Sequence, residues 1–230
     1  MLNAEGRAAV EAAVRAAEAG TRGEIYCVLA AESSDYREVP LAWAAGAALL
    51  GPALLLLFGV RVTAPEALQG WTAAQVGAAA EAAAHNALLG AVLLQGFLFV
   101  AVLLLAMIAP VRRLLTPRGL KRHRVRQHAQ ELFVAKGLHG TRERTGVLIF
   151  VSQAEHMVEL VADDGIDAKV EQSVWDEAVA VLVKGVKRGA PAEGFVAAIE
   201  RCGAVLAEHF PATDDNPNEL PDSLVMIPKL

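Results

Sequence analysis

The chain has 230 residues, of which 54% are hydrophobic, and carries a formal net charge of −5 at pH 7. This balance argues against a nucleic-acid surface, because binding to nucleic acids depends on many cationic contacts to phosphate. The two cysteines, Cys27 and Cys202, are too few for a disulfide scaffold or a zinc site. We expect both thiols to stay reduced in a cytosolic domain.

The first 35 residues predict a helix, a strand and a polar loop. Asn3 is placed to cap a helix that ends near Gly20, because apolar residues recur between them at helical spacing. Residues 24–31 (EIYCVLAA) are typical of a strand, and residues 32–35 form a polar loop. The start of the chain lacks an uninterrupted apolar core, so no signal peptide is expected.

Two uncharged apolar stretches come next, Leu41 to Val60 and Leu88 to Ala109. Each is about as long as a bilayer-spanning helix at roughly 1.5 Å per residue. A basic flank follows the second stretch, whereas the connection between them holds Arg61 as its only strong base, so the positive-inside rule places the flank in the cytoplasm. We therefore expect a transmembrane hairpin in the bacterial inner membrane with both termini cytoplasmic. A buried core hairpin of a soluble protein is the alternative.

Five bases lie soon after the end of the second stretch: Arg112, Arg113, Arg118, Lys121 and Arg122. They predict contact with anionic lipid headgroups, to which each base would contribute about 1 kcal/mol. A solvated helix face that only sets the topology explains them equally well.

The remaining sequence predicts further helices and strands that complete an α/β domain. The predicted elements are a basic helix over 117–137, strands over 146–152 and 156–162 that run antiparallel, and helices from Ser173 to near Gly189 and from Pro191 to His209. The fold class is α/β, a three-layer sandwich around a small sheet, interrupted by a transmembrane helical hairpin. Residues 1–40 and 111–210 would form the α/β domain, 41–110 the hairpin and 211–230 an extended tail.

The sequence offers one candidate functional site, an acidic turn that follows a predicted strand. The sequence contains no phosphate-binding loop, GxSxG or HExxH. Asp163, Asp164 and Asp167 directly follow a predicted strand, and three carboxylates so close repel one another unless water, a base or a cation compensates them. Oxygen ligands of this kind suit Ca²⁺ or Mg²⁺. Ser34 and Asp35 also follow a strand and would add ligands if that strand lay parallel to and beside the one ending at Ala162. The alternative is an ordinary Asp-Gly turn with a structural role.

Several segments resemble a known family. The segments ELFVAKGLHGTRERTGVLIFVS and EHMVELVADDGI, then Trp175, GFVAAI and NELPDSL, are similar to the TPM domain family of thylakoid-lumen photosystem-repair proteins and bacterial membrane proteins. The resemblance implies an α/β sandwich, weak acid-phosphatase activity and calcium binding by acidic loops. These loops would map to Asp163 and Asp164 and to Ser34 and Asp35. The internal hairpin and the lack of a signal peptide depart from exported members.

Three functions remain open at this stage. The first is a membrane-tethered module that binds a membrane or cytoplasmic protein partner, or helps to assemble membrane complexes, with or without a bound divalent cation. The second is a weak metal-assisted phosphatase that uses the turn at Asp163 and Asp164. The third is an anionic-lipid binder that uses the basic helix. The lack of a convincing nucleophile or base favours the first function.

Overall fold

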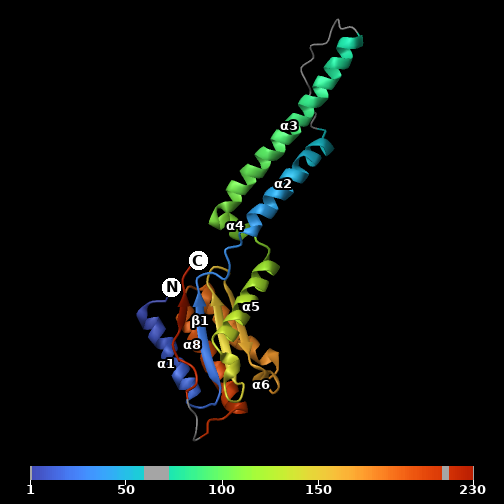
Figure 1. Cartoon of the computed structure of the whole chain (residues 1–230). Helices are drawn as coiled ribbons and strands as arrows, with labels where there is room; N and C mark the ends of the chain where they lie inside the picture. The colour runs from blue at the N-terminus through green and yellow to red at the C-terminus, as the bar shows by residue number, and fades with distance from the viewer. Residues whose placement is uncertain (1, 60–72, 214–217, 230) are drawn as a thin grey trace. The chain divides into compact units, whose positions relative to one another are not determined.

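The computed structural model describes residues 2–59, 73–213 and 218–229. Two compact units form: an α/β unit of residues 1–35 and 118–230, and a helical unit of residues 36–117. The helical unit is thus inserted into the sequence of the α/β unit (Figure 1).

The α/β unit is built on a four-stranded mixed sheet. Its strands are β1 (Glu24–Ala30), β2 (Gly146–Ser152), β3 (Met157–Ala162) and β4 (Val225–Ile227), in the spatial order β3-β2-β1-β4. β1 runs parallel to both β2 and β4, whereas β3 is antiparallel to β2. β1 and β2 are buried along their full length, as expected of strands covered on both faces.

Helices cover both faces of this sheet, which confirms the predicted three-layer α/β fold. α1 (Ala4–Glu18), α7 (Asp176–Lys187) and α8 (Pro191–His209) pack on the face that carries Ile25, Cys27 and Leu29. α5 (Arg118–Ala135) packs on the opposite face, against residues that include Tyr26 and Val28. Neighbouring residues of a strand point to opposite faces, so β1 supplies both cores in alternation.

Most predicted elements are present, with four additions in the α/β unit and some shifted ends. The tail after Pro211 contains β4, a strand that the sequence analysis did not predict. A short helix, α6 (Asp164–Asp167), follows β3, and the 3-10 helices η1 (Leu138–Gly140) and η2 (Gln172–Trp175) precede β2 and α7. β3 begins one residue later than predicted, because His156 adopts a left-handed conformation, φ 52°, in the turn before it.

The helical unit contains α2 (Glu38–Leu57), α3 (Ala73–Met107) and the short α4 (Ala109–Leu115). α2 and α3 pack closely, since a Cβ added at Gly51 would lie 2.6 Å from Leu98 Cδ1. Both helices are long and apolar enough to cross a membrane over Glu38–Leu55 and Leu88–Met107. In the second of these segments, Leu88–Met107, Ala106 is the only buried residue among those whose side chains the structure describes. Both helices are therefore mostly exposed, unlike the core helices of a soluble protein.

The ends of the predicted spans differ from the helices observed. α2 begins at Glu38, before Leu41, and Val60 lies outside the described residues. α3 begins well before Leu88 and ends at Met107, so Ala109 opens α4 instead of closing the span. Pro110, at the second position of α4, suits a new helix start, where no backbone N–H is needed.

Candidate functional site

The aspartate turn is organised as a helix cap. Asp163 is the N-cap of α6, and its Oδ1 accepts a hydrogen bond of 2.7 Å from the backbone N–H of Asp164. Asp164 forms an ion pair of 2.9 Å with Arg144. Gly165 packs so closely that a Cβ there would lie 2.5 Å from the carbonyl oxygens of Glu143 and Arg144. The three residues thus join the end of β3 to the loop before β2.

One carboxylate oxygen of this turn, Oδ2 of Asp163, has no hydrogen-bond partner among the described residues. Asp163 is 5% exposed, and this oxygen is buried. Burial, together with the charges of Asp164 and Asp163, raises the pKa of Asp167 above its ordinary value. Over residues 2–59, 73–213 and 218–229, no group of three or more His, Cys, Asp or Glu side chains is placed to hold a metal ion.

Ser34 and Asp35 lie at the other end of the sheet from the aspartate turn. Asp163 neighbours Gly146, which pairs with Glu24 at the start of β1, whereas Ser34 and Asp35 follow the end of β1. The length of β1, about 20 Å at 3.3 Å per residue, lies between the two groups. The prediction that Ser34 and Asp35 share a cation site with Asp163 and Asp164 was therefore wrong. β3 runs antiparallel to β2 and is not a neighbour of β1. Cation binding by Asp163 and Asp164 alone stays a prediction.

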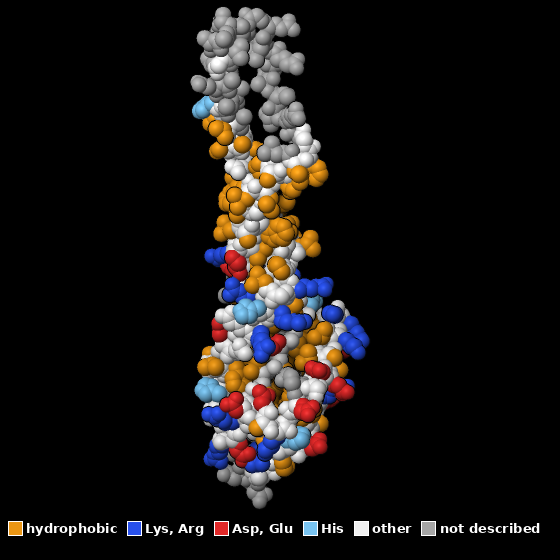
Figure 2. Space-filling view, turned by 90° about the vertical axis from the view of Figure 1, so that its right-hand side faces the viewer, with side chains coloured by type: hydrophobic (Ala, Val, Ile, Leu, Met, Phe, Trp, Pro, Cys, Tyr) orange, Lys and Arg blue, Asp and Glu red, His pale blue; other side chains and the backbone are white. Residues whose placement is uncertain are grey.

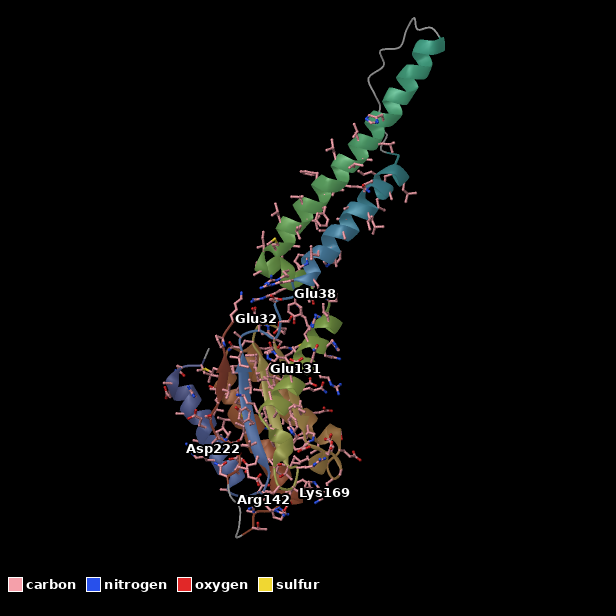
Figure 3. The ribbon with its side chains drawn as sticks, viewed as in Figure 1. Glu32, Glu38, Glu131, Arg142, Lys169 and Asp222 are labelled. Atoms are coloured by element: carbon pink, nitrogen blue, oxygen red, sulfur yellow. The ribbon has the colours of Figure 1, made fainter. Side chains whose placement is uncertain are left out.

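The loop after β1 belongs instead to a polar network. Glu155, in the β2–β3 turn, accepts hydrogen bonds from Ser152 Oγ and, at 3.3 Å, from the backbone N–H of Ser33. His128 Nδ1 of α5 lies 3.2 Å from the carbonyl oxygen of Ser33. At the same end of the sheet, Glu32 lies 3.9 Å from Lys229 Nζ. Figure 3 shows Glu32 at this end, and Arg142 and Lys169 at the opposite end of the unit.

A carboxylate pocket that the sequence analysis missed lies between α1 and the C-terminal segment. Glu18, Glu24 and Asp222 line a cavity of about 320 Å³ together with Arg15 and Asn218. Glu24 accepts backbone hydrogen bonds of 3.2 Å from Glu219 and from Leu220, which anchors the chain before β4. In Figure 3, Asp222 lies beside α1. The one sequence signal for this pocket was that Asp222 lies in NELPDSL, a segment that resembles the TPM domain family.

Two carboxyl groups of this pocket, those of Glu18 and Glu24, have raised pKa values. Burial raises the pKa of Glu18 to about 8, the charges of Glu24 and Asp222 add to this, and the N–H of Ile25 opposes it. Burial also raises the pKa of Glu24. At neutral pH the Glu18 carboxyl is therefore mostly protonated and can donate a hydrogen bond to Asp222.

A groove runs along the outer edge of β3. Side chains of α5 and α7 form its two walls, and β3 forms its floor, around a cavity of about 230 Å³. All six residues of β3 are only partly buried, in contrast to β1 and β2.

The predicted headgroup bases lie on two helices of different units. Arg112 and Arg113 lie on α4, and Arg118, Lys121 and Arg122 lie on α5. Arg118 and Arg122 are exposed and Lys121 is partly buried. Figure 2 shows Lys and Arg gathered in the upper part of the drawn face of the α/β unit, with Asp and Glu more numerous below.

These observations define an α/β sandwich whose sequence is split by an apolar helical pair. Residues 108–205 match the family model of the TPM domain, which confirms the resemblance over the segment from α4 to most of α8. The NMR structure of the BA42 protein from the psychrophilic bacterium Bizionia argentinensis is similar, with a TM-score of 0.55 and 19% sequence identity. The alignment covers 98% of this chain and 95% of that one, and it supports the fold. The search of curated proteins gave no match.

Proposed function

We propose that this protein is a membrane-anchored interaction module, in which α2 and α3 cross the bacterial inner membrane and the TPM-like α/β unit lies in the cytoplasm. The observation that carries the proposal is the exposed apolar surface of an inserted helical unit. Leu49, Leu93 and Phe97, for example, are 69–72% exposed. Such a continuous apolar surface needs a lipid or protein environment.

The site of insertion supports a tether. The chain leaves the α/β unit after Asp35 and returns to it at Arg118, so two connections hold the unit to the helical pair. The bases that follow α3 agree with a cytoplasmic position for both connections. A module held in this way at the membrane surface is suited to bind a protein partner or to assist the assembly of a membrane complex.

Accessibility of single cysteines in intact bacterial cells tests the topology. Cys27 and Cys202 are 2% and 0% exposed, and burial raises the pKa of both thiols, so they should stay unreactive in the folded protein. A cysteine at Glu66, in the connection between the helices, should react with a membrane-impermeant maleimide. A cysteine at Lys136, exposed at the end of α5, should react only after permeabilisation.

The reverse labelling pattern would show that the proposed orientation is wrong. Equal labelling of both positions without permeabilisation would show that α2 and α3 do not span the membrane. The unchanged chain, with its two buried thiols, is the control for background reaction.

A cation-assisted role remains a second candidate because of one observation. The buried Oδ2 of Asp163 lacks a partner among the described residues, and a divalent cation would satisfy it. Turnover of a generic phosphate ester that depends on Ca²⁺ or Mg²⁺ would support the phosphatase alternative. Loss of that turnover in Asp163→Asn, with the fold retained, would assign it to this turn.

The exposed bases of α5 favour contact with anionic lipid as a third role. Arg118 and Arg122 project from a helix that follows the proposed second span within about 15 residues, the distance over which the positive-inside rule acts. Reconstitution in anionic and in zwitterionic vesicles tests this role, because only anionic lipid should protect these arginines from modification by a dicarbonyl reagent.

A further inference from the structure

The outer edge of β3 has free backbone hydrogen-bonding groups. The N–H of Asp163 donates to the carbonyl oxygen of Gly146, the residue directly opposite in the β2–β3 register. Hydrogen-bonded and non-hydrogen-bonded residue pairs alternate along an antiparallel ladder. Every second residue before Asp163 therefore also directs its backbone N–H and C=O groups toward β2. The N–H and C=O groups of Val158, Leu160 and Ala162 therefore point away from the sheet.

Nothing else in the described chain takes up these groups. No hydrogen bond joins the backbone of Val158, Leu160 or Ala162 to a residue outside the sheet within residues 2–59, 73–213 and 218–229. Proteins commonly protect an edge with proline, with outward charge or by keeping the strand short. β4, the other edge strand, has three residues, whereas β3 has six and contains no proline.

The two walls of the groove differ in chemistry. Val179 and Val183 of α7 form an apolar wall on the side to which Val158 points. Arg122 of α5 lines the opposite side, to which Glu159 points. A new strand beside β3 would place alternate side chains against these two walls.

The α5 wall has an excess of positive charge. Arg126 lies 3.8 Å from Glu159, whereas exposed Arg122 forms no ion pair with another described residue. Two guanidinium groups therefore face one carboxylate on this side. An acidic side chain on the incoming strand would supply the missing negative charge.

The helices that form the walls argue against a second copy of this unit as the occupant. Both α5 and α7 contact β3. Pairing of β3 with its copy would bring equivalent strands within about 4.8 Å, and with them two α5 helices on one face. Packed helices need 8–10 Å between axes. A bare extended peptide carries no such helices.

We propose that the β3 edge binds an extended segment of a partner protein as an additional strand, with apolar side chains against Val179 and Val183 and an acidic side chain against Arg122. This inference rests on the proposed interaction module and specifies the partner. Main-chain hydrogen bonds to Val158 and Leu160 supply affinity, and the two walls select a sequence that alternates apolar and acidic residues.

Peptide binding to the full chain in nanodiscs of zwitterionic lipid tests the proposal. The probe is the fluorescent heptapeptide Thr-Val-Glu-Val-Glu-Val-Thr, measured by fluorescence polarisation. One control peptide replaces both glutamates by lysine. A second replaces the central valine by proline, which removes one N–H. The probe should bind, and the lysine peptide should bind at least about tenfold more weakly, since a charge-assisted hydrogen bond contributes that much. The proline peptide should also bind more weakly, because it lacks one main-chain hydrogen bond to β3.

A pair of matched arginine variants locates the site. Arg122→Glu should weaken probe binding about tenfold and favour the lysine peptide, whereas Arg118→Glu, on the same helix and also exposed, should leave both affinities within about twofold. Residue-resolved hydrogen exchange gives a readout independent of charge. Saturating probe should slow exchange of the Val158 and Leu160 amides, while the Glu159 amide, which faces β2, should be unchanged.

Several results would overturn the proposal. They are absence of probe binding at millimolar concentration, equal effects of the two arginine variants, or slow exchange of Val158 and Leu160 before the probe is added. None of these results bears on cysteine labelling at Glu66, so failure of the peptide site is distinguishable from failure of the membrane topology.

Discussion

Replacing Glu18 by glutamine should make the stability of the α/β unit less dependent on pH. Burial beside Glu24 and Asp222 raises the pKa of Glu18 to about 8, against an ordinary value of 4.5 that the unfolded chain recovers. Between these two values the folded state holds a proton that the unfolded state has released. The free energy of unfolding therefore falls as pH rises through this window.

The pH dependence of the free energy of unfolding can be calculated from the single proton that Glu18 binds in the folded state. A full difference of one bound proton changes the free energy of unfolding by about 1.4 kcal/mol per pH unit. From pH 5.5 to 7.5 the parent chain should lose up to about 2.7 kcal/mol on this account. Glu18→Gln should not lose it, because the amide still accepts the 2.8 Å hydrogen bond from Ile25 and can donate to Asp222, but cannot ionise.

Denaturant unfolding followed by Trp175 fluorescence provides the assay. Trp175 is 1% exposed, and replacing Trp43 and Trp71 by phenylalanine leaves it as the only tryptophan. Glu11→Gln is the matched control, because Glu11 lies on the same helix and pairs at the surface with Arg7. Parallel pH profiles for the parent and Glu18→Gln would refute the proposed protonation of the pocket.

Three other changes test the fold and the turn. Joining Asp35 to Arg118 by a flexible linker should give a soluble α/β unit with cooperative thermal unfolding by circular dichroism, since loop closure adds little entropy cost; insoluble products at several linker lengths would show that the helical unit supplies core. Gly165→Ala should lower the free energy of unfolding by about 2 kcal/mol, because the added Cβ meets backbone oxygens; unchanged stability in urea would contradict that close approach. Millimolar Ca²⁺ or Mg²⁺ should raise the melting temperature of the parent in calorimetry, and Asp163→Asn with Asp164→Asn should remove that rise; a parent that does not respond eliminates the cation site.

Local patterns were sufficient to predict the central elements of the α/β unit. The apolar run of β2 and the proline-opened helix α8 have the predicted bounds, Gly146–Ser152 and Pro191–His209. Gly189 ends the preceding helical segment in a left-handed conformation, φ 76°, as its place in the sequence indicated. In each case the signal lies within a few residues of the element that it specifies.

Features that depend on distant partners could not be predicted in this way. β4 is a three-residue strand that exists because it pairs with β1, almost 200 residues earlier in the chain. The parallel pairing of β1 with β2 places Ser34 and Asp35 at the opposite end of the sheet from the aspartate turn, and no local pattern encodes that pairing. The carboxylate pocket likewise unites Glu18 with Asp222, which only the folded tail brings to α1.

The position of the helical insertion also determines the order in which the sheet can form during synthesis. β1 lies between β2 and β4, yet it leaves the ribosome before α2 and α3, and both of its neighbours are made after them. At roughly 5–20 residues per second, β1 waits several seconds for β2 and longer for β4. During that interval its apolar residues have no strand to pair with. Both helices are therefore synthesised before the α/β unit can be completed.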